Sequence, residues 1–261
     1  MVVNAYFCIG FSRGNFIKRK KNMNYQEFNS TINSRERELE MSQAFPVLMR
    51  KVYTWMALAL VITGVTAYGV AHSPAVLQAI YGNPIAFWVL AAAELGIVFY
   101  TSARIQKIAL TTATLMFILF SVINGVTLAY IFLVYTASSI AKVFFITAGT
   151  FAAMAVFGYT TKRDLSKMGS IMMMALIGLI IAGIVNIFLK SSGLEFIICI
   201  AGVLIFVGLT AWDTQKIKEM LMDAEDAGES AQKIALLGAL SLYLDFINLF
   251  IHLLRLLGNR E

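Results

Sequence analysis

The sequence predicts an all-α polytopic membrane protein, and three observations lead to that fold class. Hydrophobic residues make up 59% of the 261 residues and charged residues only 14%, against about 25% charged in an ordinary soluble domain. The apolar residues occur in stretches close to the roughly 20 residues that cross a bilayer as a helix. No stretch alternates with the two-residue period of a membrane-spanning strand. Too few charges remain to cover a soluble surface, and the chain is too apolar for a disordered protein.

Seven apolar segments are expected to cross the membrane after a polar N-terminal region. Residues 1–47 are expected to form a polar cytosolic extension, in which Met23 is an alternative start to Met1. Residues 48–261 are expected to form the transmembrane domain. Its segments have the approximate limits 50–71, 84–103, 108–131, 139–160, 169–189, 194–216 and 232–257. Most connections between them are short, which indicates a compact helical bundle.

The positions of the basic residues indicate the orientation of the chain. When the seven segments alternate across the membrane, 17 of the 21 Lys and Arg residues fall on the side of the N-terminus and 4 on the other. Basic residues are retained on the cytosolic side. The N-terminus is therefore expected in the cytosol, and an odd number of spans places the C-terminus outside. The net charge of +6 follows from this topology and does not point to a nucleic-acid partner.

Three acidic residues lie inside apolar segments, where an ionisable side chain is costly. Glu94 is in the second segment, Asp213 in the sixth and Asp245 in the seventh. Each would cost about 2.5 to 3.5 kcal/mol at the centre of a membrane helix. Intramembrane acids usually face a protein interior or a water-filled path and serve function. We therefore take these three residues as candidate functional residues.

The seventh segment carries a stripe of polar residues at helical spacing. The residues of this stripe are Ser241, Asp245, Asn248, His252 and Arg255, which follow one another by four, three, four and three positions. Such spacing places all five on one face of a helix. The stripe is expected to line a protein interior or an ion pathway. The alternative is an amphipathic helix that lies on the membrane surface.

Asp213 and Asp245 lie on consecutive segments, so their carboxyl groups can meet across a helix pair. Two carboxyl groups in contact in a dry site cannot both ionise, so the pair is expected to share a proton and to respond to pH. Carboxylate oxygens favour Ca²⁺ over transition metals, but a tight Ca²⁺ site uses six to eight oxygens. We expect a weak calcium contact at this pair, with Ca²⁺ as a permeant ion and no tightly bound cofactor.

Three motifs resemble those of a known family. The stretch Ala239-Leu240-Ser241-Leu242-Tyr243-Leu244-Asp245-Phe246-Ile247-Asn248-Leu249-Phe250, with Leu253-Leu254-Arg255 after it, resembles the C-terminal signature of the Bax inhibitor-1 family, the transmembrane Bax inhibitor motif proteins. Asp213-Thr214-Gln215-Lys216-Ile217 resembles the second family motif, and Asn124-Gly125-Val126-Thr127-Leu128 is similar to the motif in the third helix. The likeness is to the bacterial branch and covers residues 45–258 in order and spacing.

The resemblance implies a seventh helix that sits centrally among the other six. It also implies a pH-sensitive Ca²⁺ leak in which Asp213 and Asp245 act as proton sensor and gate. Arg104 is the nearest candidate for the arginine that latches the sixth-helix Asp in bacterial members, and Glu94 matches the second-helix acid. The location implied is the inner membrane of a prokaryotic cell. The expected partners are the bilayer, calcium ions, protons and unidentified membrane proteins.

Rival functions differ in what they require of the sequence. An intramembrane aspartyl protease also uses two membrane Asp residues, but its motifs resemble Tyr-Asp and Gly-x-Gly-Asp. Here Trp212 precedes Asp213, and Tyr243-Leu244 precedes Asp245, so we expect no enzyme. A proton-coupled transporter would also use buried acids. That reading and a non-conducting regulator that binds partner proteins both stay open.

Overall fold

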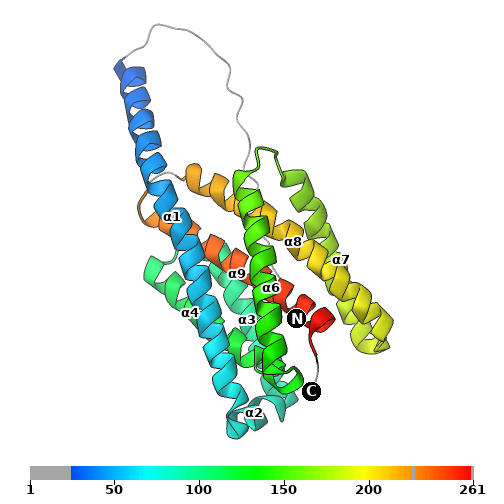
Figure 1. Ribbon diagram of the computed structural model, residues 1–261. Helices are drawn as coiled ribbons and strands as arrows, with labels where there is room; N and C mark the ends of the chain where they lie inside the picture. The colour runs from blue at the N-terminus through cyan, green and yellow to red at the C-terminus, as the bar shows by residue number, and fades with distance from the viewer. Residues whose placement is uncertain (1–24, 225–226, 260–261) are drawn as a thin grey trace.

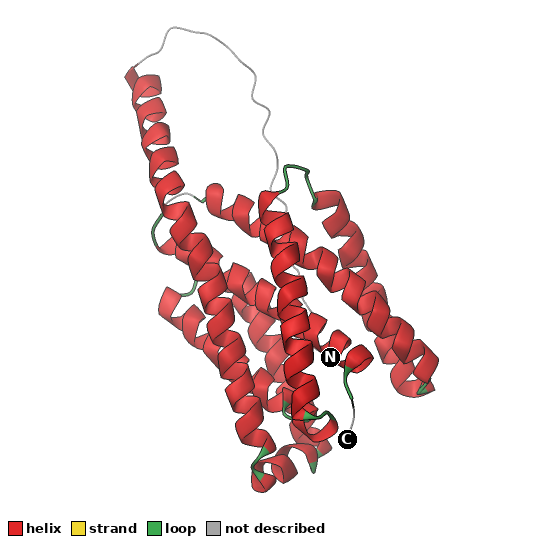
Figure 2. Ribbon diagram, viewed as in Figure 1, coloured by secondary structure: helices red, strands yellow, loops and turns green. Residues whose placement is uncertain are grey.

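The chain forms helices joined by short connections (Figures 1 and 2). The computed structural model describes residues 25–224 and 227–259. The helices in these ranges are α1 (Tyr25–Ala71), α2 (Pro74–Tyr81), α3 (Pro84–Arg104), α4 (Leu110–Leu128), α5 (Ile131–Val134), α6 (Ala137–Thr160), α7 (Ser166–Leu189), α8 (Ser192–Met222) and α9 (Glu229–Leu257). The prediction of an all-α fold is confirmed.

Six spans among the described residues are long and apolar enough to cross a membrane, which confirms a polytopic membrane protein. These spans are Leu39–Ala71, Leu110–Val134, Ala137–Thr160, Ser166–Leu189, Ser192–Met222 and Glu229–Leu257. They correspond to six of the seven predicted segments. The remaining segment, predicted at 84–103, is helix α3, which has 21 residues.

Several helices begin at residues that satisfy the free backbone N–H groups of the first turn. The Asn83 side chain accepts a hydrogen bond from the backbone N–H of Ile85, and Pro84 follows it as the first helical residue of α3. The Thr136 hydroxyl accepts from the N–H of Ser139 at the start of α6. The Ser191 hydroxyl does the same for Leu194 at the start of α8. Such caps typically stabilise a helix by about 1 kcal/mol.

Two helices extend beyond the predicted limits of their spans. Helix α1 is continuous from Tyr25 to Ala71 and contains Pro46, so it crosses the boundary predicted at residue 47. Helix α8 continues to Met222, although the span was predicted to end at 216. The charged end of α8 stays helical because Ile217 and Leu221, one turn apart, are 1% and 0% exposed.

Helix α9 occupies the centre of the bundle. In the apolar 18-residue stretch of α9, 78% is buried inside the protein. The corresponding share is 17% to 50% in the other five spans. It packs against α1, α4, α6 and α8, and Figure 1 shows it between α1 and α4 on one side and α6 and α8 on the other. This enclosure is incompatible with the alternative of an amphipathic helix that lies on the membrane surface.

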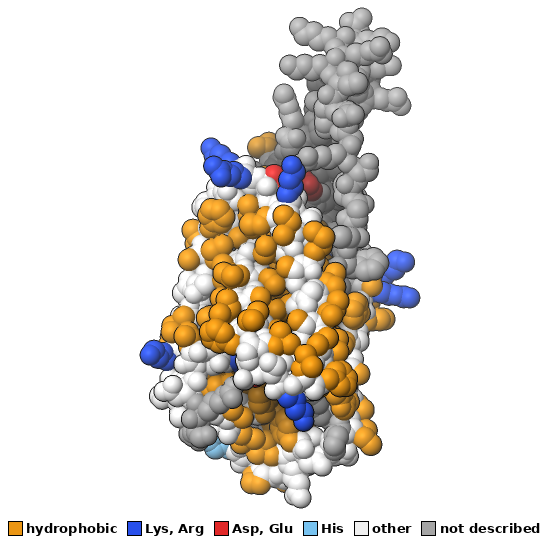
Figure 3. All heavy atoms as spheres, turned by 90° about the vertical axis from the view of Figure 1, so that its right-hand side faces the viewer, with side chains coloured by type: hydrophobic (Ala, Val, Ile, Leu, Met, Phe, Trp, Pro, Cys, Tyr) orange, Lys and Arg blue, Asp and Glu red, His pale blue; other side chains and the backbone are white. Residues whose placement is uncertain are grey.

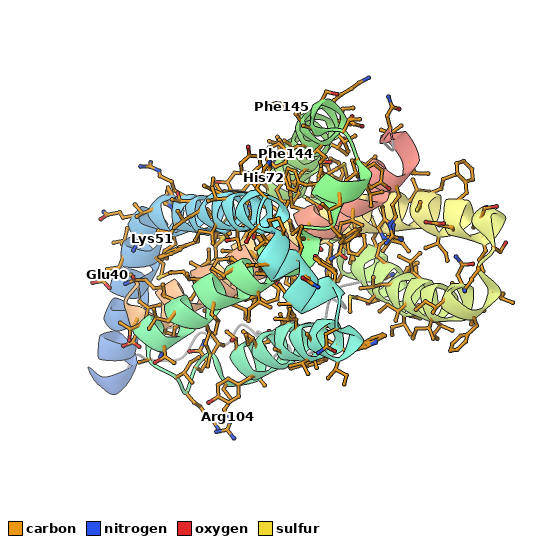
Figure 4. All side chains as sticks on the ribbon, turned by 90° about the horizontal axis from the view of Figure 1, so that it is seen from below. Glu40, Lys51, His72, Arg104, Phe144 and Phe145 are labelled. Carbon is orange, nitrogen blue, oxygen red and sulfur yellow. The ribbon has the colours of Figure 1, made fainter. Side chains whose placement is uncertain are left out.

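The outer surface of the bundle is apolar. Phe145 on α6 and Phe188 on α7 are 73% and 81% exposed, and Phe145 points away from the bundle in Figure 4. Figure 3 shows that hydrophobic side chains cover the middle of one face, with Lys and Arg side chains above them, at the edges and in the lower part of the face. An apolar surface of this extent is typical of a protein that faces lipid.

Candidate functional site

The interface between α8 and α9 has a register that two glycines define. A Cβ atom at Gly202 of α8 would lie 2.6 Å from the His252 ring of α9, and one at Gly238 of α9 would lie 2.9 Å from the Ile217 side chain of α8. The early part of α8 therefore faces the late part of α9, and the two helices run antiparallel. Small residues at such contacts let helix backbones approach closely in a membrane.

This register places Asp213 and Asp245 opposite one another. Asp245 is seven residues from both Gly238 and His252, so it lies on the face of α9 that meets α8. Asp213 lies one turn before Ile217, on the face of α8 that meets α9. Along the helix axes the two residues are about one turn apart. Each side chain leans toward the N-terminus of its own helix, so in antiparallel helices the two carboxyl groups lean toward each other.

Both carboxyl groups are removed from solvent and lipid. Asp213 is 2% exposed and Asp245 is 0% exposed. Two acids that face each other in such a setting cannot both carry a charge without separation or hydration. The interface can therefore respond to proton concentration.

The rest of the predicted polar stripe of α9 divides into a buried and an exposed part. Asn248 is 6% exposed, and its amide donates to the Leu244 carbonyl oxygen of its own helix at 2.7 Å. His252 is 7% exposed and stacks on Phe206 of α8. Its Nδ1 has no hydrogen-bond partner among the described residues. Ser241 is half-buried. The part of the stripe from Ser241 to His252 thus lies inside the protein.

Arg255 ends this stripe in a different environment. It is exposed near the C-terminal end of α9, close to Tyr130 in the turn between α4 and α5. The predicted common face of the five residues is therefore present, but its last member lies at the outer end of the bundle.

Residues next to Asp213 tie α8 to two other parts of the bundle. Tyr53 of α1 lies close to Thr214. The Gln215 side chain accepts from the N–H of Leu165 and donates to the carbonyl oxygen of Arg163, both at 2.8 Å. The connection between α6 and α7 is therefore anchored on α8 close to the candidate gate.

Glu94 belongs to a separate polar network on the other side of α9. The Thr127 hydroxyl of α4 donates to Glu94 Oε1 at 2.6 Å. The Tyr243 hydroxyl of α9 donates to Asn124 Oδ1 of α4 at 3.0 Å and lies 2.7 Å from the Thr63 hydroxyl of α1. We call these five residues the Tyr243 network. It joins α1, α3, α4 and α9.

The structure does not bring Glu94 or Arg104 to the carboxyl pair. Tyr243 and Asp245 are two positions apart on α9, so the Tyr243 network and the pair lie on opposite faces of that helix. Arg104 is exposed at the end of α3, where its guanidinium lies 6.0 Å from the centre of the Tyr100 ring. It projects away from the bundle in Figure 4. A latch between Arg104 and Asp213 stays a prediction that requires a movement of these helices.

The described residues contain no group of three or more His, Cys, Asp or Glu side chains that could hold a metal ion. The carboxyl pair offers four oxygens at most, fewer than the six to eight of a tight Ca²⁺ site. Its chemistry suits a brief contact with a hard cation.

Sequence reasoning missed most of the Tyr243 network. It singled out Glu94 as a candidate and quoted Asn124 and Thr127 only as part of a motif. Thr63 carried no signal, because a lone hydroxyl is common in membrane helices and can bond to its own backbone. The sequence did indicate a polar contact at Asn124, since an amide inside an apolar segment needs hydrogen-bond partners.

Comparisons with known proteins identify relatives over nearly the whole transmembrane region. Residues 46–261 match the family described as "Inhibitor of apoptosis-promoting Bax1". The chain is 48% identical over 215 residues to "Inner membrane protein YbhL" of Escherichia coli K12, which covers 82% of this chain and 92% of that protein. It is 46% identical over 213 residues to a Borreliella burgdorferi protein, with coverage of 82% and 92%.

A protein of Rickettsia prowazekii is 42% identical over 239 residues, which is 90% of this chain and 99% of that protein. The region that matches the family, residues 46–261, includes the three motifs and the candidate residues described above. The resemblance inferred from those motifs is confirmed, and the chain belongs to the Bax inhibitor-1 family.

Proposed function

We propose that this protein is a pH-sensitive, calcium-permeable leak channel whose gate is the pair Asp213 and Asp245. The observation that carries the proposal is the opposition of two buried carboxyl groups across the antiparallel α8–α9 interface. The channel resides in the inner membrane of a prokaryotic cell, with its N-terminus in the cytosol. The family membership and the name of the E. coli relative support this location.

The proposed channel has seven spans, with α9 as the central one. Helix α3 is the seventh span in addition to the six apolar ones, because its 21 residues can cross the hydrocarbon core at 1.5 Å per residue. The burial of α9 supports its central place. Seven spans leave the C-terminus outside.

Proton sharing explains how the gate would respond to pH. In acid the two carboxyl groups share a proton and stay in contact, which holds α8 and α9 together. When the proton leaves, two like charges face each other in a dry interface and repel. They separate, hydrate or attract a cation, and oxygen ligands of this kind favour Ca²⁺. The leak is therefore low at acidic pH and rises as the pH increases.

The neighbouring polar groups supply the rest of the proposed pathway. Ser241, Asn248 and His252 continue along the α9 face that carries Asp245, and Arg255 lies at its outer end. Glu94 is an accessory acid on the opposite side of α9. Arg104 is the candidate latch of Asp213. Protons, Ca²⁺ and the bilayer are the partners in this mechanism, and the cation is not retained as a cofactor.

A calcium flux measurement tests the proposal directly. Purified protein is reconstituted into liposomes that contain a Ca²⁺ indicator, and influx is recorded from pH 5 to 8. We expect the influx of wild-type protein to rise with pH. Asp213→Asn and Asp245→Asn should each abolish that rise or move its midpoint, because an amide cannot share or release the proton.

The matched control is Asp223→Asn, which makes the same chemical change at an exposed position at the end of α8. Its pH profile should equal that of the wild type. Unchanged profiles for both gate variants would overturn the gate assignment. Absence of flux at every pH in well-folded protein would overturn the channel and favour a non-conducting regulator or a proton-coupled transporter.

A further inference from the structure

A groove with an apolar lining opens between α1 and α6. Its volume is about 460 Å³, within the roughly 300 to 1,000 Å³ range of small-molecule sites. Its walls include Pro46, Met49 and Tyr53 of α1 and Phe151, Ala155 and Tyr159 of α6. The small side chain of Ala155 leaves space on the α6 wall.

The groove opens toward lipid on its α6 side. Val156, which lines it, is 62% exposed. From Tyr159 to Phe151 the α6 wall extends about 12 Å at 1.5 Å per residue. Tyr159 lies one residue before the end of α6, next to the basic connection with Lys162 and Arg163. The groove thus runs from the basic end of the bundle into the apolar region.

Positive charge gathers at the same end of the groove. Arg50 is exposed and is the one charged residue in the described lining. The Lys218 ammonium lies 5.1 Å from the centre of the Tyr159 ring and donates to the Tyr159 carbonyl oxygen at 3.0 Å. Two cations therefore border the mouth of the groove, and its lining contains no acid among the described residues.

We propose that this groove binds an anionic phospholipid, with one acyl chain between α1 and α6 and the phosphate beside Arg50 and Lys218. The apolar walls match an acyl chain, and the two cations match a headgroup that carries net negative charge. Tyr53 forms part of the wall and lies close to Thr214, the neighbour of Asp213, where α1 contacts α8. A chain in the groove packs on Tyr53 and holds α1 against α8 next to the gate.

Native mass spectrometry of the detergent-solubilised protein tests the proposal by measuring lipid binding rather than flux. The protein is titrated with phosphatidylglycerol and, separately, with phosphatidylcholine of the same chains. Wild-type protein should bind its first phosphatidylglycerol about fivefold more tightly than its first phosphatidylcholine, since one cation near a membrane surface has about this effect on affinity. Arg50→Gln should remove most of that preference, because it weakens the binding of phosphatidylglycerol more than that of phosphatidylcholine. Equal affinities of the wild type for the two lipids would overturn the proposal that the groove selects an anionic headgroup.

A pair of alanines on α6 tests the position of the site. Ala152 lines the groove, and Ala153 is exposed but does not line it. Ala152→Phe should fill the groove and weaken phosphatidylglycerol binding at least about fivefold, whereas Ala153→Phe should leave it unchanged. Val156→Phe is a second groove-filling variant in case the first does not fold. Equal binding by the filled and control variants would overturn the site.

Two further controls separate the headgroup from other anions. Arg163→Gln removes a cation in the same membrane region outside the groove lining and should not change the preference for phosphatidylglycerol. Myristate is added as a competitor at the same concentration as phosphatidylglycerol. Displacement of phosphatidylglycerol would identify a free fatty acid as the occupant and overturn the proposal of a phospholipid site. Because the measurement does not depend on Ca²⁺ flux, its result is independent of the proposed leak.

Discussion

At the residue scale, Tyr243 connects the central helix to two others. Its hydroxyl is within hydrogen-bond distance of Thr63 on α1 and Asn124 on α4. Its ring packs edge-on against Phe117 and Phe120 of α4. Tyr243 is 0% exposed, so its polar atom has no access to water. This contact resists rotation of α9 about its axis, and such a rotation would turn Asp245 away from α8.

Tyr243→Phe should therefore destabilise the protein although it keeps the ring. The substitution leaves Asn124 Oδ1 and the Thr63 hydroxyl with fewer partners in a dry environment, and such losses cost about 1 to 3 kcal/mol each. Thermal unfolding of the purified protein in detergent should show a lower midpoint. The control is Tyr68→Phe on α1, which removes a hydroxyl from an exposed tyrosine. If the two variants unfold at the same temperature, the network does not stabilise the fold.

At the element scale, glycines decide how closely helices pack around α8. The Gly158 Cα of α6 lies against the backbone of Ala211 on α8, so that a Cβ there would collide with the Ala211 carbonyl oxygen. Gly202 and Gly238 have the same role between α8 and α9. In a membrane, where apolar side chains gain little by leaving lipid, such close approach is a main source of helix association.

Gly158→Ala should thus separate α6 from α8 and lower stability. The added methyl group cannot be accommodated without a backbone shift, and overpacking of this kind costs about 1 to 3 kcal/mol. Gly149→Ala on the same helix is the matched control, because nothing lies within 4 Å of its Cβ position. Alanine is also the better helix former, by about 1 kcal/mol in water. Thermal unfolding of both variants should therefore give shifts of different sign or size, and equal losses would contradict the assigned contact.

The spacing of the polar residues predicted which of them share one face of α9, but not which helix packs against that face. The four-and-three spacing of Asp245, Asn248 and His252 was enough to place them on one face of α9. It could not say that α8 covers that face, because helix neighbours depend on the whole arrangement of the bundle. The end of α8 was predicted too early, since Ile217 and Leu221 are separated by charged residues that face the other way.

At the scale of the whole molecule, the distribution of the basic residues predicts an orientation in the membrane. The proposed topology places the connection between α6 and α7 in the cytosol and the connection between α7 and α8 outside. Lys162 lies in the first and Ser191 in the second, and both are exposed. A reagent that cannot cross the membrane distinguishes these two positions.

Single cysteines at the two positions should react differently with a membrane-impermeant maleimide. On a background in which Cys8 and Cys199 are changed to Ser, Ser191→Cys should be labelled in intact cells. Lys162→Cys should be labelled only after the membrane is broken. Labelling of Lys162→Cys in intact cells together with protection of Ser191→Cys would reverse the orientation. The physical reason for the expected result is the retention of basic residues on the cytosolic side.

The amino-acid sequence by itself determined the class of the protein, the approximate limits of its spans and the three acids that do not belong in lipid. These properties follow from local composition and from periodicity, which each segment carries alone. Only the tertiary structure decided that Asp213 and Asp245 face each other while Glu94 joins a separate network through Thr127. It also decided that Arg104 lies at the surface. Contacts between helices depend on register and on close packing at residues such as Gly202 and Gly238, and no single segment contains that information.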